Sequence, residues 1–158
     1  MARKSTHAAA TLTVTHQEQL TINGRDYGGY TTSTYTNIVN VDKRILTVTT
    51  AEATVATFAG AMAPGTYIPA KVKYIRMTNL DDTNHITLTF ANENDDEFAV
   101  KLDAGQTFAL CGDNGGGMAD VIDAIDGTGL TYSLGDMKSI TADADTASCD
   151  MEIFIASV

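Results

Sequence analysis

The sequence predicts an all-β fold, a single-domain antiparallel β-sandwich that is jelly-roll-like and has at most one short helix. Apolar and polar residues alternate with period two over several segments, the pattern of half-buried strands. Threonine, a β-branched residue that favours strands, supplies 24 of the 158 residues. Turn signals recur about every 10–12 residues in the clearest block, the spacing of a sandwich or barrel.

In the first half of the chain, alternation begins at Thr11 and continues to Ile22, where Asn23-Gly24 gives a strong turn signal. Two further strands are expected at Thr31–Thr36 and Thr54–Phe58, with a turn at Pro64-Gly65. Residues 37–50 are rich in Ile and Val and predict one or two strands around a basic turn, Asp42-Lys43-Arg44.

The second half holds the strongest strand signals. The block Lys71–Leu110 predicts a meander of four strands, in which Asp103-Ala104-Gly105 closes a short hairpin. Met118–Ile125 has apolar residues at helical spacing and predicts a helix of about two turns. The region 127–146 is expected to be irregular, and Ser148–Ser157 a strand with Met151, Ile153 and Ile155 on one face.

No repeat, linker or composition break indicates a second domain. We therefore expect a flexible basic arm over residues 1–9 and one sandwich domain over 10–158. We expect no membrane segment and no secretory signal, because no apolar run is long enough and no charged start precedes one. Residues 1–79 carry a net charge of +4 and residues 80–158 a net charge of −14. An anionic face repels phosphates, so nucleic-acid binding is not expected.

Residue patterns that support catalysis or a cofactor are weak throughout. His7, His16 and His85 are scattered, and no paired spacing indicates zinc. Three acidic clusters, 81–84, 92–97, and Asp143 and Asp145 with Asp150, have oxygen ligands suited to Ca²⁺. None matches a calcium-loop motif, so solvated turns are favoured. Gly115-Gly116-Gly117 has no following Lys and is interpreted as a connection rather than a phosphate cradle. We expect no enzyme activity, catalytic residue, metal or cofactor.

Two remaining features concern thiols and aromatic residues. Cys111 and Cys149 are expected to stay free thiols, as in a reducing cytoplasm, and the sequence leaves a bridge between them open. Tyr27, Tyr30 and Tyr35, with Thr31–Thr34, form an uncharged strip rich in hydroxyl groups. Such a strip suits a protein interface or sugar contact, and an ordinary edge strand is the alternative.

The block Lys71–Leu110 resembles a pattern in small virion proteins of tailed bacteriophages, including marine and cyanobacterial phages. The matching parts are the strand ending Arg76-Met77-Thr78-Asn79-Leu80-Asp81-Asp82, the strand Ile86–Phe90, and the turn that begins at Lys101-Leu102 and includes Gly105. The resemblance implies a jelly-roll-like sandwich that acts as a capsid cement or decoration protein, commonly a trimer, on the virion surface. Head fibres and tail parts that bind a host glycan or receptor are the alternative.

On this hypothesis the partners are two further copies in a homotrimer and the major capsid protein, with assembly in the host cytoplasm. The residues expected to face the shell are the basic ones of the arm and of the predicted turn. They are Arg3, Lys4, Lys43 and Arg44. Several modest contacts of this kind, held together, raise the overall affinity.

Overall fold

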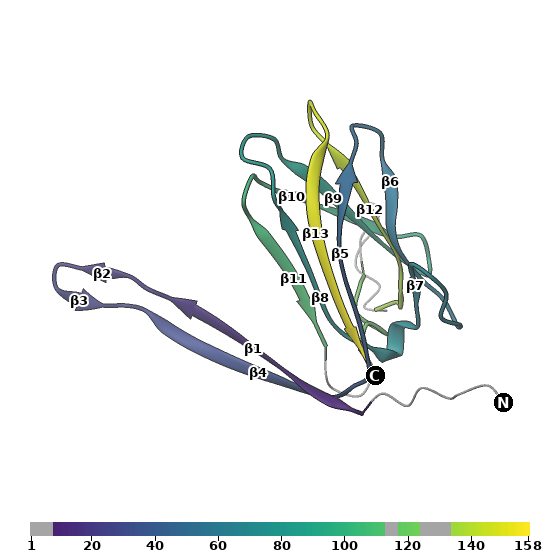
Figure 1. Ribbon diagram of the computed structural model, residues 1–158, viewed down its shortest axis with the longest axis horizontal. Coiled ribbons are helices and arrows are strands. Elements are labelled where there is room, and N and C mark those ends of the chain that lie inside the picture. Colours follow the sequence, from purple (N-terminus) through teal and green to yellow (C-terminus); the bar gives the residue numbers. More distant parts are fainter. Residues whose placement is uncertain (1–7, 113–116, 124–133) are drawn as a thin grey trace. The chain divides into compact units, whose positions relative to one another are not determined.

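The computed structural model describes residues 8–112, 117–123 and 134–158 (Figure 1). The chain divides into two compact units. Asn40–Ser157 form one unit, and Met1–Val39 with Val158 form the other. Residues 10–38, which the sequence assigns to the sandwich domain, thus belong to a unit of their own. The arm residues Arg3 and Lys4 lie outside the described residues.

The unit Asn40–Ser157 is a jelly roll. One sheet has the order β11-β8-β13-β5 and the other β10-β9-β12-β6-β7. Apart from β7, the eight strands alternate between the sheets in chain order except at β9 and β10, which are neighbours in the second sheet; this is the order of a double Greek key. The sandwich prediction is confirmed. The strands of the first sheet are β5 (Asn40–Val48), β8 (Val72–Asn79), β11 (Thr107–Cys111) and β13 (Cys149–Ser157). Those of the second are β6 (Ala53–Phe58), β7 (Thr66–Tyr67), β9 (Ile86–Asn92), β10 (Glu97–Leu102) and β12 (Met137–Ala144).

Alternating side chains of the two sheets make the core. Met151, Ile153 and Ile155 of β13 are at most 1% exposed, so the prediction of one apolar face is confirmed for this strand. On the opposite sheet the fully buried Phe90 stacks on Phe98, with ring centroids 4.9 Å apart. Burying side chains of this size contributes about 1.5–3 kcal/mol each, which makes this core the main source of stability.

The predicted meander is wrong, although its four strands are present. β8 pairs with β13 and β11, whereas β9 pairs with β12 and β10. The turn at Asp103-Ala104-Gly105 therefore connects the two sheets instead of closing a hairpin, and Gly105 has the expected positive φ of 70°. Period-two alternation shows where a strand lies but not which strand it pairs with, because pairing is a long-range property.

Two expectations for the last third of the chain are also wrong. Within the predicted helix Met118–Ile125, Asp120 has a φ of 50°, and Ile122 forms a bridge with Gly135. Residues 124 and 125 lie outside the described part. The region expected to be irregular contains β12, a central strand that buries Ile140 and two alanines. A helix of two turns is marginal without tertiary support, and alanine gives little hydrophobic contrast in a strand.

The other unit contains a long two-stranded ribbon (Figure 1). β1 (Ala10–Glu18) pairs antiparallel with β4 (Gly29–Ile38). Beyond them, β2 (Thr21–Ile22) and β3 (Arg25–Asp26) are joined by the predicted turn. Asn23 and Gly24 have φ values of 51° and 76°, as a type I′ hairpin turn requires.

A buried asparagine holds the loops at one end of the sandwich. The side-chain amide of Asn92 is fully buried and donates to the backbone oxygen of Ile122, 3.2 Å away, and to a carboxylate oxygen of Asp96, 3.0 Å away. Its Oδ1 accepts the backbone N–H groups of Asn94 and Asp96, both at 2.9 Å. One side chain thereby hydrogen-bonds to polar groups of the turn between β9 and β10 and also binds the segment around Ile122.

We expect Asn92→Ala to lower the free energy of unfolding by about 2–4 kcal/mol, because it removes the four hydrogen bonds of this buried side chain. Asn94→Ala, at an exposed position of the same turn, should change it by less than about 0.5 kcal/mol. Urea unfolding followed by circular dichroism measures both. Equal stability of the two variants would contradict the role assigned to the Asn92 amide.

Candidate interaction surface

The ribbon has two chemically different faces. Leu12 lies opposite Tyr35, and Val14 lies opposite Ser33, so these four residues share one face. The other face carries threonines, with Thr13 opposite Thr34 and Thr15 opposite Thr32. The hydroxyl groups of Thr15 and Thr32 are 3.3 Å apart. The ribbon is therefore amphipathic, with an apolar face and a hydroxyl face.

The three tyrosines proposed as one strip do not share a face. Tyr30 lies opposite Gln17 on the hydroxyl face, whereas Tyr35 lies on the apolar face and is 4% exposed. Positions 30 and 35 differ by an odd number, and in a strand this places side chains on opposite sides. Tyr27, between β3 and β4, is 59% exposed, and Tyr30 is 77% exposed. Of the three tyrosines, only these two are accessible.

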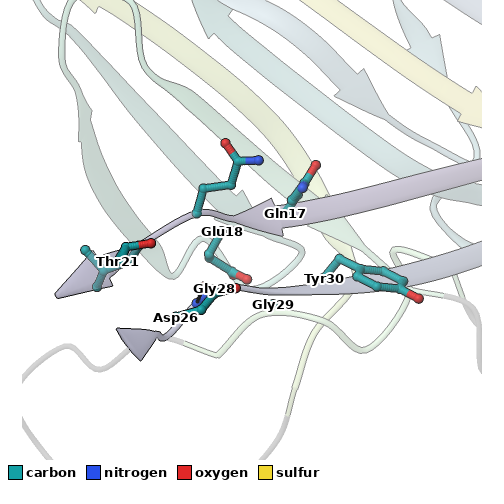
Figure 2. Close-up of a pocket in the computed structure, with 9 residues that line it drawn as sticks. Gln17, Glu18, Thr21, Asp26, Gly28, Gly29 and Tyr30 are labelled. Carbon is teal, nitrogen blue, oxygen red and sulfur yellow. Dashed lines mark hydrogen bonds between the residues drawn. The ribbon is translucent and has the colours of Figure 1, made fainter. Parts of the chain in front are cut away.

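A polar hollow of about 490 Å³ lies where β1 and β4 end and the hairpin of β2 and β3, here called the outer hairpin, begins (Figure 2). Its lining includes Gln17, the carboxylates of Glu18 and Asp26, and Tyr30. Amide, carboxylate and aromatic groups in one open hollow can hydrogen-bond and stack against a polar ring.

Gly28 is required at this point of the ribbon. Its backbone N–H donates to Oδ1 of Asp26 at 2.8 Å. A Cβ at position 28 would lie 2.3 Å from the backbone oxygen of Glu18, whereas one at Gly29 would meet only Oε2 of Glu18 at 3.8 Å. The two strands therefore approach too closely at position 28 for any side chain.

Lys43 and Arg44 do not form a turn. They lie in the middle of β5 and, being adjacent in a strand, point to opposite faces. Arg44 donates to the backbone oxygen of Val55 at 2.6 Å and pairs with Asp42 at 3.2 Å. Asp42 in turn accepts a hydrogen bond from the hydroxyl of Tyr67. Arg44 thus links the two sheets, and Lys43, whose side chain is 58% exposed, is the more available of the two.

An ion-pair row crosses the outer face of the four-stranded sheet. Lys43 Nζ lies 3.3 Å from Oε2 of Glu152, and Arg76 donates to Oε1 of the same carboxylate. The hydrogen bond from Arg76, helped by that from Lys43, lowers the pKa of Glu152. The guanidinium of Arg76 also lies 6.0 Å from the ring centre of Phe154. This row joins β5, β13 and β8 across their outer face.

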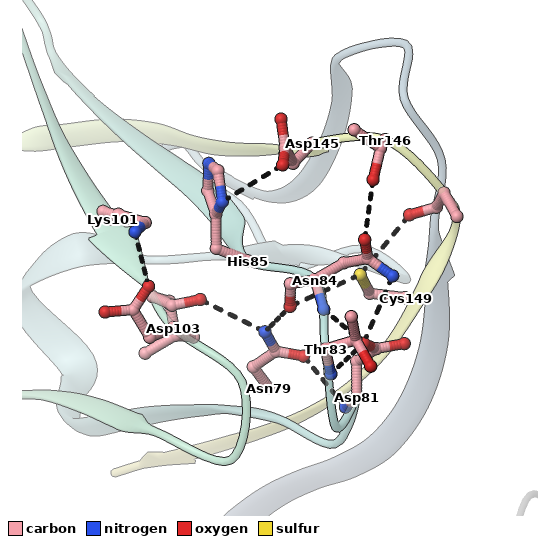
Figure 3. Close-up of polar contacts among 12 residues, drawn as sticks. Asn79, Asp81, Thr83, Asn84, His85, Lys101, Asp103, Asp145, Thr146 and Cys149 are labelled. Atoms are coloured by element: carbon pink, nitrogen blue, oxygen red, sulfur yellow. Dashed lines mark hydrogen bonds and ion pairs between the residues drawn. The ribbon is translucent and has the colours of Figure 1, made fainter.

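The acidic loop 81–84 hydrogen-bonds to its own backbone (Figure 3). One carboxylate oxygen of Asp81 accepts the N–H groups of Asn84 at 2.6 Å and Thr83 at 2.8 Å, which lowers the pKa of Asp81. Buried Asn79 donates to the Asn84 backbone oxygen at 2.8 Å and accepts from Asp81 N–H at 3.0 Å. These contacts support the interpretation of this loop as a turn. Across residues 8–112, 117–123 and 134–158, no three His, Cys, Asp or Glu side chains are placed to hold a metal ion.

The two cysteines are free thiols. Cys149 is buried at the start of β13, and burial raises the pKa of its thiol. Cys111 is exposed at the end of β11. Nδ1 of His85 lies 3.5 Å from Asp145 at the same end of the sandwich as the acidic loop (Figure 3). No helix of the described chain has the length and apolarity to cross a membrane.

We expect Gly28→Ala to separate the outer hairpin from its present register, because the added methyl group cannot fit beside Glu18. Amide hydrogen exchange over residues 17–30 should then become at least about tenfold faster, while β13 keeps its protection. Gly29→Ala is the matched control and should exchange like the wild type. Unchanged exchange in Gly28→Ala would contradict the close approach.

We expect acid to weaken the Glu152 row. Because folding lowers this pKa, the carboxylate stabilises the fold above its ordinary pKa of about 4.5, and that contribution disappears as the pH falls through the folded value. Glu152→Gln should therefore lose less stability on acidification than the wild type. Glu93→Gln is the control, since no ion pair involves Glu93 in the described part of the chain. Identical pH profiles for all three proteins would refute the prediction.

No protein-family model matches the chain. No curated protein matches it either. A solved structure described with the words "Bacillus endospore appendages form a novel family of disulfide-linked pili" aligns with 100% of this chain and 96% of its own chain. The TM-score is 0.42 and the identity 7%, so this likeness carries no argument about assembly or function. The resemblance of residues 71–110 to phage virion proteins stays a prediction.

Proposed function

We propose that the protein is a non-enzymatic structural component of a phage virion, a capsid decoration or cement protein. On this proposal it binds the outside of the head and stabilises contacts between major capsid subunits. The sequence resemblance over residues 71–110 and the jelly-roll fold both support it. The resemblance brings no catalytic residues, so the proposal assigns none.

The ribbon is the observation that carries the proposal. A two-stranded ribbon is marginal alone in water, and this one has apolar side chains at its outer end. Leu20 is 51% exposed and Ile22 is 50% exposed, beside the exposed Tyr27 and Tyr30. Exposed apolar and aromatic groups gathered on one element are typical of a surface that binds another protein.

The net charges of the two units also support a binding role for the ribbon. Residues 40–157 contain seven basic and eighteen acidic residues, a net charge of −11, whereas residues 1–39 carry +1. An acidic body repels nucleic acid, so the proposal includes no nucleic-acid partner and no membrane. Arg3 and Lys4 of the arm supply two of the three basic residues in this count. In a homotrimer, three such arms and ribbons would bind the shell together and multiply modest contacts.

A second candidate is a fibre or tail component that binds a host glycan or receptor. The polar hollow beside Tyr30 favours it, because a sugar ring stacks on an aromatic side chain and hydrogen-bonds to nearby carboxylates and amides. On either proposal the protein acts at the virion surface after assembly in the host cytoplasm.

The shell-binding proposal is tested with purified phage heads that lack the protein. We expect Arg3→Ala/Lys4→Ala and Tyr27→Ala/Tyr30→Ala each to weaken co-sedimentation with heads at least about fivefold, through lost charge and lost apolar contact respectively. Leu80→Ala, at a position 48% exposed in the sandwich, is the control. Wild-type protein that does not bind heads but binds an envelope glycan would favour the second candidate, and binding to neither would overturn both.

A further inference from the structure

We propose that the ribbon of one copy pairs with the free edge of β5 in a second copy, and thereby extends the four-stranded sheet across the boundary between subunits. The inference goes beyond the proposed virion function, because self-association can be measured without a capsid. It rests on the length of this edge, on the groove beside it and on the chemistry of the ribbon.

β5 ends the order β11-β8-β13-β5 and pairs only with β13, so its other edge has no strand partner in the described chain. It is nine residues long, about 30 Å. The other edge strands of the sandwich are shorter: β10 has six residues, β11 five and β7 two. Unpaired backbone N–H and C=O groups over such a length are a template for an added strand.

The charges in β5 do not protect this edge. Charged side chains often keep an edge strand from pairing. Here Arg44 and Asp42 point toward the sandwich and bond to Val55 and Tyr67. Lys43 pairs with Glu152 of β13. On the outer face of β5, next to Lys43, the apolar Val41 and Ile45 are 57% and 61% exposed.

Two hollows adjoin β5, and the smaller of them is also lined by Ile155 and Ser157 of β13. The larger, about 470 Å³, lies between β5 and β6, and its lining includes Leu46, Val55 and Ala56. The smaller, about 240 Å³, includes Val41, Met62 and Tyr67 in its lining. Pro64 and Gly65 line both hollows, so the two adjoin. We call the space between the two sheets beside β5, which these two hollows occupy, the open seam. A strand added to β5 would place its inward side chains there.

The ribbon has the properties this site requires. β1 has nine residues and β4 ten, matching the nine of β5. Neither strand contains proline or lysine, and β4 has no charged residue, so nothing in them opposes pairing at the outer edges. An added ribbon would turn one face to the open seam and the other to solvent. The face with Leu12 and Val14 suits the seam, and the threonine face suits solvent.

Charge selects the ribbon as the occupant and a second copy as its source. Two bodies of net charge −11 repel each other, so contact between sandwich and sandwich is disfavoured. The ribbon, residues 10–38, carries a net charge of only −1, from Arg25, Glu18 and Asp26, so it meets an acidic body with much less of this penalty. A contact between unlike surfaces is head-to-tail and can close into a ring, as a trimer requires.

The test is the self-association of full-length protein, measured by light scattering across a dilution series. Val41→Lys/Ile45→Lys places lysines beside the incoming strand and should raise the dissociation constant at least about tenfold. Leu80→Lys/Leu134→Lys is the matched control, since these leucines are 48% and 53% exposed and the charge change is identical. Both variants reduce the net negative charge, so general repulsion cannot explain a loss.

Cross-linking keeps the proposal testable if the lysine variant does not fold. Two single-site proteins, Thr34→Cys in the ribbon and Ile45→Cys in β5, are made in a Cys111→Ser background. They are then mixed and treated with a short bismaleimide. We expect the mixed Thr34→Cys–Ile45→Cys dimer as the main product, since buried Cys149 is protected. Monomeric wild-type protein at about 100 μM, a lysine variant that associates like the wild type, or products linking only like sites would each overturn the proposal.

Discussion

The pairing of the last strand with two early ones is the constraint on which the sandwich depends. β13 lies between β5 and β8 and pairs with both along nearly its whole length. Its inward residues meet Phe90 and Leu88 of the opposite sheet in one core. Because this strand comes last in the chain, the four-stranded sheet cannot be completed until the whole domain has been made, and its contacts are dominated by long sequence separations.

The same topology leaves β5 with one free edge. β13 occupies one side of β5, and the chain that precedes β5, through Val39 to β4, belongs to a separate unit. Within the described residues, the outer edges of β1 and β4 in the ribbon also have no strand partner. In the described part of the chain both units therefore have strand edges without a strand partner, which assembly with other chains would pair. The protein also combines a nearly neutral ribbon with an acidic body. Decoration of a shell and association between copies are compatible uses of these edges.

The sequence predicts where strands lie better than how they pair. Ile86, Leu88 and Phe90 contrast sharply with the threonines between them, so the sequence predicts β9. Asn23-Gly24 predicts the turn between β2 and β3 by its preference for positive φ. The sequence does not predict β12, because Ala142 and Ala144 at inward positions give little apolar contrast. The polar residues between the inward positions do keep the alternation. The prediction of one strip with three tyrosines is wrong because Tyr30 and Tyr35 are an odd number of positions apart in β4, which places them on opposite faces. The groove beside β5 depends on pairing order, which alternation does not determine.

We propose that another copy of the chain completes the ribbon and the β5 edge. Hydrogen exchange of the full-length protein at low and high concentration tests it most directly. We expect amides of β4 and β5 to gain protection together as concentration rises, while those of central β13 do not change. Protection in β4 and β5 that is independent of concentration, or that changes in only one of the two strands, would contradict it.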